Sequence, residues 1–159
     1  MRALLGLGAN LGDPVATLRE AKTRLGDIGT VTAVSSLYRT PPWGGVDQPP
    51  FVNAALALET ALDPDALLGA LKALERNLGR VASVRWGPRA IDLDILDYEG
   101  VRRHDAVLTI PHARLLERAF VLVPLAEIEP AFGTARDALA PDDLAAVERI
   151  GAFESEGPR

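Results

Sequence analysis

Two stretches of the chain begin with the same Asp-Pro pair and end on a glycine, and this pattern constrains the fold most. They are residues 12–26 (GDPVATLREAKTRLG) and residues 63–79 (DPDALLGALKALERNLG). Each has an aspartate that can cap a helix, a proline suited to the first turn and apolar residues at helical spacing. We therefore predict two amphipathic helices. Their apolar faces carry Val15, Leu18, Ala21 and Leu25 in the first, and Leu67, Leu71, Leu74 and Leu78 in the second.

Segments with strand composition precede and follow these helices. Residues 3–8 and residues 30–40 are short and rich in apolar or β-branched side chains. Residues 51–60 alternate with period two, so one face carries valine and leucine while the other carries Phe51, Asn53 and alanines. Residues 90–98 form a further predicted strand. Interleaved helices and hairpin-spaced strands favour an α+β fold, in which helices pack on an antiparallel sheet.

Other segments predict less regular structure. Residues 40–50 (TPPWGGVDQPP) hold four prolines and two glycines, which predicts a long surface loop of the kind that often carries function. Residues 118–128 suit either a short helix or a strand because they include Pro124. Residues 141–150 indicate a final helix. We expect one domain over residues 1–159, with a frayed tail from about residue 152.

Composition excludes several classes of protein. The chain has no cysteine, so it has neither disulfides nor thiolate metal ligands. Its net charge of −5 argues against nucleic-acid binding. No apolar run has the length of a membrane span or of a signal-peptide core, so we expect a cytoplasmic enzyme or binding domain. The segment 72–89 is locally basic, with five cations and one acid, Glu75, which suggests a small anionic ligand.

Two aspartates in the stretch IDLDIL raise the main question about function. On a strand, Asp92 and Asp94 point to the same side, while Ile91, Leu93 and Ile95 face the core. Like charges on one face repel each other unless a cation lies between them, and magnesium is held by one or two carboxylates plus water and phosphate oxygens. The alternative is a solvated polar face, paired with nearby arginines. Both interpretations fit these residues alone.

The arginines before this strand favour the metal interpretation. Arg80, Arg85 and Arg89 precede the aspartates closely, and guanidinium groups match phosphate oxygens. Carboxylates for a metal beside arginines for phosphate are what phosphoryl transfer needs. The glycines of GLGANLGD lack the lysine of a P-loop, so the site would belong to another class of nucleotide site.

Two further features carry a functional and an ordinary interpretation. Phe51 and Asn53 can stack on and hydrogen-bond a flat heterocycle, or they can be a core ring and a backbone-bonding amide. His112 can be a ligand or a structural hydrogen-bonder, and Trp86 can serve a ligand or cover a core edge.

Three long stretches, residues 35–60, 78–100 and 108–128, resemble 6-hydroxymethyl-7,8-dihydropterin pyrophosphokinase of folate biosynthesis. The motifs RTPPWG, FVNAA, RWGPRAIDLDIL and IPHARLLERAFVLVPL follow one another in the family's order. The resemblance runs from GLGANLGD to about Pro130. It implies pyrophosphate transfer from ATP to the pterin hydroxymethyl group, giving AMP, with two magnesium ions. It also implies a ferredoxin-like fold with helices on both faces of the sheet in three layers.

The resemblance also implies roles for individual residues. Asp92 and Asp94 match the metal-binding pair, and Asp92 lies near the pterin hydroxyl. The catalytic set is Arg80, Arg89, Asp92 and Asp94. The residues matched to the pterin site are Thr40, Pro41, Pro42, Trp43, Phe51, Asn53, Asp92 and Phe120. Those matched to the ATP site are Glu75, Arg80, Arg85, Trp86, Arg89, Ile95, Thr109, His112 and Arg118, of which Glu75, Ile95 and Thr109 surround the adenosine.

Two positions depart from the family's pattern. Ala82 stands where members commonly have a second arginine, and Ala113 stands where some have an aromatic residue. Both lie on the phosphate side of the site. The expected ligands are small molecules, ATP and the pterin, with no nucleic acid and no membrane, and we expect a monomer. The alternative function is a non-catalytic nucleotide- or pterin-binding module derived from the enzyme.

Overall fold

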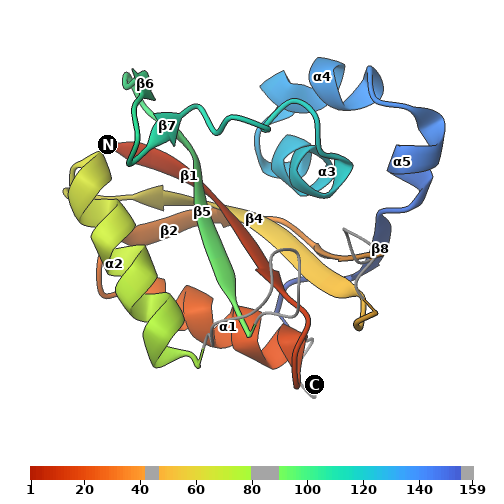
Figure 1. Cartoon of the computed structure of the whole chain (residues 1–159), viewed down its shortest axis with the longest axis horizontal. Coiled ribbons are helices and arrows are strands. Elements are labelled where there is room, and N and C mark those ends of the chain that lie inside the picture. The colour runs from red at the N-terminus through yellow and green to blue at the C-terminus, as the bar shows by residue number, and fades with distance from the viewer. Residues whose placement is uncertain (42–46, 80–89, 155–159) are drawn as a thin grey trace.

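An antiparallel sheet organises the molecule (Figure 1). We describe it from a computed structural model that covers residues 1–41, 47–79 and 90–154. Five strands lie in the order β5-β1-β4-β3-β8, and β2 pairs with β4 beside β3. A separate ribbon pairs β6 with β7. The strands are β1 (Arg2–Ala9), β2 (Thr30–Val34), β3 (Leu37–Thr40), β4 (Phe51–Glu59), β5 (Asp92–Tyr98), β6 (Arg103–His104), β7 (Thr109–Ile110) and β8 (Glu148–Gly151).

Both helices that begin with Asp-Pro form where the sequence predicts them. The Asp13 carboxylate accepts a hydrogen bond from the Ala16 amide at 3.1 Å, and Asp63 caps the second helix in the same way at 2.8 Å. Residues 118–128 resolve as a helix despite Pro124. The helices are α1 (Pro14–Leu25), α2 (Pro64–Asn77), α3 (Ala119–Ile128), the 3-10 turn η1 (Pro130–Phe132), α4 (Gly133–Asp137) and α5 (Pro141–Ala145).

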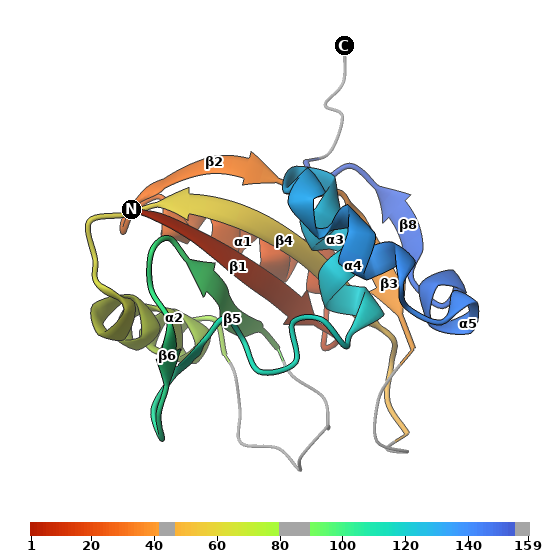
Figure 2. The same ribbon diagram turned by 90° about the horizontal axis from the view of Figure 1, so that it is seen from above.

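The two faces of the sheet bury different cores. On β4, one face carries Val52, Ala54, Leu56 and Leu58, which pack with the apolar sides of α1 and α2 in the larger cluster. The other face carries Ala55 and Ala57, which pack with Leu125 of α3 in a smaller cluster. The alternation predicted for residues 51–60 is therefore confirmed. In Figure 2, α1 and α2 lie on one side of the sheet and α3 on the other. Part of the α3 side is consequently left for a site.

Two predictions about secondary structure need correction. Residues 30–40 are not one strand, because regular pairing is interrupted at Ser35 and Ser36 between β2 and β3, although the Ser35 amide still donates to the Ala55 carbonyl of β4 at 2.9 Å. Residues 141–150 are not one helix: α5 ends at Ala145, and residues 148–151 form β8, which pairs with β3. Pairing with an open strand edge outweighed helical propensity there.

The predicted fraying from about residue 152 does not hold for the next two residues. Phe153 is 3% exposed and packs in the larger core, and its carbonyl oxygen accepts a hydrogen bond from Arg19 Nε at 2.7 Å. Lys22 pairs with Glu154 at 2.7 Å. The remaining tail, residues 155–159, lies outside the described residues. No helix in the described part of the chain has the length and apolarity needed to cross a bilayer.

A polar network joins α3 to the start of β3. Glu127 accepts hydrogen bonds from the Tyr38 hydroxyl at 2.5 Å and from the Ser36 amide at 2.8 Å. Arg149 of β8 donates to the Ser36 hydroxyl at 2.9 Å. Burial, together with the Glu127 hydrogen bond, raises the pKa of Tyr38 to about 12. This network holds α3 on the sheet where the chain passes from β2 to β3.

Replacing Glu127 by alanine should lower the free energy of unfolding by about 1–2 kcal/mol, because the Tyr38 hydroxyl and the Ser36 amide lose their acceptor. Urea titration followed by circular dichroism measures the loss. The matched control is Glu154→Ala, which removes a more exposed ion pair and should cost under about 1 kcal/mol. Equal losses in the two variants would show that the Glu127 network adds nothing beyond a surface pair.

Candidate active site

A flat strip of backbone forms the floor of the site. On the α3 side of the sheet, β1 presents Gly6 and Gly8, which lie between β5 and β4. Gly8 pairs with Asp92 on one side and with Asn53 on the other, and Gly6 pairs in the same way with Asp94 and Ala55. A Cβ atom at Gly8 would lie 2.8 Å from Asn53 Nδ2. The missing side chains therefore leave room between the carboxylates and the amide.

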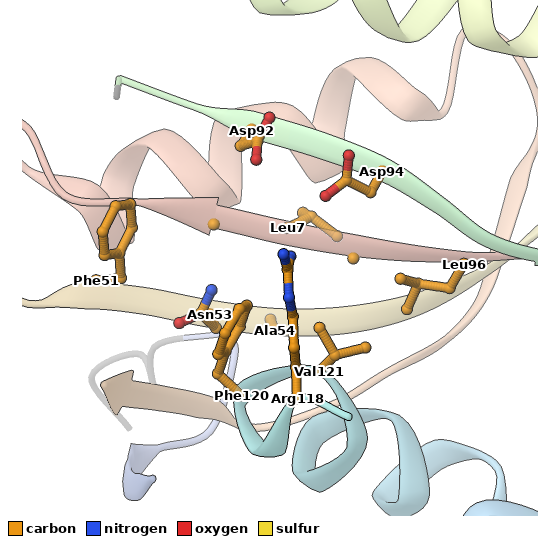
Figure 3. A pocket seen from close by; sticks show the side chains of 12 residues that line it. Leu7, Phe51, Asn53, Ala54, Asp92, Asp94, Leu96, Arg118, Phe120 and Val121 are labelled. Carbon is orange, nitrogen blue, oxygen red and sulfur yellow. The ribbon is translucent and has the colours of Figure 1, made fainter. Parts of the chain in front are cut away.

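A pocket opens over this floor (Figure 3). Its volume is about 130 Å³, of the order of a small ligand group. The two aspartates of β5, Phe51 and Asn53 of β4, and Phe120 of α3 all line it. The Arg118 side chain reaches from the start of α3 toward the aspartates, and its guanidinium carbon lies 5.6 Å from the centre of the Phe120 ring. The remaining lining residues are Gly6, Leu7, Gly8, Ala54, Leu96 and Val121.

The strand that carries the aspartates is held from its outer edge. Within the part of the chain that the structure describes, β5 is the last strand of the sheet on its side, so its outward N–H groups face no neighbouring strand there. Glu75 of α2 fills this gap: its carboxylate, only 2% exposed, accepts a hydrogen bond from the Leu93 amide at 2.9 Å. Lys72 lies 3.2 Å from the other oxygen of Glu75. The residue between the two aspartates is thereby fixed to α2.

The two carboxylates on β5 destabilise each other's charged form. Burial, and then repulsion from Asp92, raises the pKa of Asp94 to about 7, and Glu75 adds to the increase. Lys72 and Arg118 act in the opposite direction. A divalent cation between the carboxylates would remove this cost. No cluster of three or more His, Asp or Glu side chains that could hold a metal occurs among the described residues. Two carboxylates alone fit magnesium, which keeps several waters and takes phosphate oxygens.

His112 follows β7 and lies against β5. Its backbone amide donates a hydrogen bond to the Leu96 carbonyl at 2.8 Å, which holds the segment after β7 against the strand. The Arg114 amide donates to His112 Nδ1 at 3.2 Å, so the imidazole proton lies on Nε2. Burial, and then Arg118, lowers the pKa of His112. The ring is therefore a neutral donor that interacts electrostatically with Asp92.

The structure brings together most of the predicted site residues that it describes. Asp92, Asp94, Phe51, Asn53, Phe120 and Arg118 share the pocket, and Thr40 and Pro41 line a neighbouring hollow that also contacts Phe120. Ile95 differs, because its side chain is 3% exposed and packs in the core. Its backbone faces the outer edge of β5, as Leu93 does, so any ligand contact there comes from the main chain. Pro42, Trp43, Arg80, Arg85, Trp86 and Arg89 lie outside the described residues, as does Ala82.

Sequence reasoning missed three residues that shape the site. From the sequence, Gly6 and Gly8 are interpreted only as part of GLGANLGD, which lacks the lysine of a P-loop, although glycines at alternate positions of a strand signal a close approach to its face. Asn10, at the end of β1, is 2% exposed and donates to Gln48 Oε1 at 2.8 Å and to the Pro49 carbonyl at 3.0 Å. It ties the end of β1 to the chain that leads into β4.

Comparison with known proteins shows the family of the chain. Residues 4–130 match the family model described as 7,8-dihydro-6-hydroxymethylpterin-pyrophosphokinase (HPPK). The chain belongs to the HPPK family. Two relatives named 2-amino-4-hydroxy-6-hydroxymethyldihydropteridine pyrophosphokinase support this. The protein from Methylorubrum extorquens is 49% identical over 155 residues, covering 94% of this chain and 98% of its own. The protein from Bacillus subtilis is 46% identical over 128 residues, covering 79% of this chain and 77% of its own.

Solved structures support the fold. The Plasmodium falciparum HPPK-DHPS A437G/K540E structure with pterin and p-hydroxybenzoate matches with a TM-score of 0.65 at 16% identity. The match covers 86% of this chain and 43% of the Plasmodium chain, so this chain spans less than half of that protein. At this identity the likeness establishes a shared fold. The mixed α+β architecture with an antiparallel sheet is thus common to this chain and to an HPPK-DHPS protein.

The raised pKa of Asp94 predicts a pH dependence of stability. In the unfolded chain this carboxyl titrates near its ordinary value of 3.8, and in the folded HPPK domain it titrates at about 7. Between these values the folded state binds the additional proton, so the contribution of Asp94 to the free energy of unfolding falls as pH rises from about 4 to about 7. Urea titrations in EDTA should show this slope in the wild type and a flatter one in Asp94→Asn. Parallel pH profiles would show that Asp94 is ionised throughout.

The glycine floor predicts a graded effect of small side chains. Gly8→Ala should displace Asn53, because the new Cβ would lie 2.8 Å from Nδ2, and pterin affinity should fall roughly two- to tenfold, the worth of one hydrogen bond. At Gly6 the nearest atom is Leu96 Cδ2 at 3.3 Å, so Gly6→Ala is the milder control. Calorimetry with pterin measures both. A larger loss for Gly6→Ala would show that pterin affinity does not depend on the room that Gly8 leaves beside Asn53.

Proposed function

We propose that this chain transfers pyrophosphate from ATP to the hydroxymethyl group of 6-hydroxymethyl-7,8-dihydropterin, giving AMP and the pterin diphosphate in folate biosynthesis. The observation that carries the proposal is that a carboxylate pair and a ring-binding set line one pocket. Asp92 and Asp94 come from β5, Asn53 and Phe51 from β4, and Phe120 from α3. A heterocycle bound by Phe51, Asn53 and Phe120 would bring its substituent to the two aspartates.

In the proposed complex, Phe51 and Phe120 stack on the pterin and Asn53 hydrogen-bonds its edge. The hydroxymethyl oxygen then approaches the β-phosphorus of ATP. A bond forms between these atoms, the bond from the β-phosphorus to the oxygen bridging the α-phosphorus breaks, and AMP leaves. Asp92, which borders the pocket, orients the hydroxyl and accepts its proton. The chain thus acts mainly by positioning, as expected for phosphoryl transfer.

Magnesium would be held by Asp92 and Asp94, and its charge would neutralise the phosphates when it is bound. The family resemblance supports two ions. From the described residues, Arg118 and neutral His112 would donate to phosphate oxygens, and Glu75, Ile95 and Thr109 would lie around the adenosine. The remaining phosphate ligands of the proposal are Arg80, Arg85, Trp86 and Arg89. Pro41, Pro42 and Trp43 join Thr40 on the pterin side.

The setting of the enzyme is also proposed. The α+β sheet is assigned to the ferredoxin-like, three-layer class, and residues 1–159 to one pyrophosphokinase domain. We propose a cytoplasmic monomer that acts on small molecules and binds neither nucleic acid nor membranes. The net charge of −5 supports the absence of nucleic-acid binding. Light scattering on the purified protein measures the oligomeric state.

The direct test mixes purified protein with ATP, magnesium and hydroxymethyl-dihydropterin, and separates the nucleotides. Pyrophosphoryl transfer yields AMP with the pterin diphosphate in equal amounts. ADP as the product would mean transfer of a single phosphoryl group. Binding of both substrates with no AMP would instead identify a non-catalytic module. An incubation without pterin controls for hydrolysis of ATP.

Removal of either proposed metal-binding carboxylate should reduce turnover without unfolding the protein. Asp92→Asn and Asp94→Asn should each cost roughly a thousandfold in kcat, as expected for loss of a principal electrostatic element. Asp97→Asn is the matched control: it changes the same residue type on the same strand, outside the pocket lining, and should keep near-normal turnover. Near-normal turnover in Asp92→Asn or Asp94→Asn would refute the metal assignment.

A further inference from the structure

The Asn53 amide accepts a hydrogen bond from the buried hydroxyl of Thr40. Thr40, at the end of β3, is 4% exposed, and its hydroxyl donates a hydrogen bond to Asn53 Oδ1 at 2.8 Å. The two residues lie diagonally across neighbouring strands, because Thr40 pairs with Phe51 and Tyr38 pairs with Asn53. Both side chains are therefore on the α3 face of the sheet, with Thr40 behind Asn53 as seen from the aspartates.

This hydrogen bond gives the oxygen and the nitrogen of the Asn53 amide different roles. Oδ1 accepts the hydrogen bond from Thr40, and among the described residues Nδ2 donates to no acceptor. Nδ2 points over Gly8, since a Cβ atom there would lie 2.8 Å from it, and Figure 3 shows it directed into the pocket. Asn53 is itself 8% exposed, so its orientation is set by its neighbours rather than by bulk water.

A second interaction opposes rotation of the amide by half a turn. Gly8 pairs with both Asn53 and Asp92, so Asn53 and Asp92 lie on strands two spacings apart, roughly 10 Å at the backbone. The negative potential of the carboxylate pair attracts the N–H end of the amide and repels its oxygen. In the rotated state Oδ1 would face the carboxylates, and the Thr40 hydroxyl would lose the acceptor it now has. The two effects favour the same orientation.

We infer that Thr40 is a positioning residue that fixes Asn53 as a hydrogen-bond donor to the ligand. The recognised edge of the heterocycle must then offer an acceptor at Asn53, either a carbonyl oxygen or an unprotonated ring nitrogen. The inference rests on the proposed function, since it takes the pterin as the ligand of this pocket. Thr40 then contributes to ligand selectivity indirectly, because its hydroxyl sets the orientation of the Asn53 amide.

The test is a double-mutant cycle on the full chain, read by calorimetry with hydroxymethyl-dihydropterin in the presence of magnesium and a non-hydrolysable ATP analogue. Thr40→Val keeps the shape and removes the hydroxyl, and should weaken pterin binding about three- to tenfold. Affinity for the ATP analogue should not change. Thr40→Ser restores the hydroxyl and should bind the pterin within about twofold of the wild type. In an Asn53→Ala background, Thr40→Val should cost nothing further, because its effect passes through the amide.

Controls separate positioning from general stability. Thr60→Val removes another buried hydroxyl, which donates to the Ile28 carbonyl at 2.8 Å at the far end of β4, and should leave pterin affinity unchanged. Thr40→Ala repeats the measurement if the valine variant does not fold. An equal loss of pterin affinity with and without Asn53, or an equal loss for the ATP analogue, would overturn the inference. A wild-type protein that binds no pterin would refute the proposed function and this inference together.

Discussion

Repulsion between two carboxylates on one face of an edge strand is the constraint on which the site depends. Asp92 and Asp94 stand side by side on β5, and burial with this repulsion raises the pKa of Asp94 to about 7. Such an arrangement destabilises the ligand-free fold, so it must be held from elsewhere. Glu75 does this by accepting the Leu93 amide hydrogen bond on the outer edge of β5. A third carboxylate thus fixes the backbone between the pair while adding to its negative potential.

One face of the sheet packs most of the hydrophobic core, and the other face carries the candidate site. The face toward α1 and α2 carries the larger core, built from leucines such as Leu18 and Leu71 that are wholly buried. The face toward α3 carries a smaller core around Leu125 and leaves the space over Gly6 and Gly8 for ligands. Because these strands have side chains on alternate faces, one sequence can serve both purposes. The polar network of Glu127 then holds α3, which carries Arg118 and Phe120, over the second face.

The extent to which the sequence predicts the structure varies from element to element. Both Asp-Pro helices and the two faces of β4 follow from local periodicity, and they formed as predicted. The segment 141–150 did not, because β8 exists only through its pairing with β3. The two aspartates of β5 and the pair Phe51 and Asn53 were predicted from strand periodicity and side-chain chemistry. Arg118 and Phe120 were predicted from the family's motifs, whereas Gly8 was missed. The role of Gly8 depends on Asn53, which lies 45 positions further along the chain and pairs with Gly8 only in the folded sheet.

By itself, the sequence determined the two Asp-Pro helices, the two faces of β4, the like-charge pair on β5 and membership of the HPPK family. These properties follow from patterns over a few residues: a capping aspartate, a period of two or 3.6, and motifs in a given order. Only the tertiary structure decided that Thr40 orients Asn53, that Glu75 holds Leu93, and that Asn53 and Asp92 face each other across Gly8. Such contacts join residues far apart in the chain, and strand register and helix packing, which no local pattern encodes, bring them together.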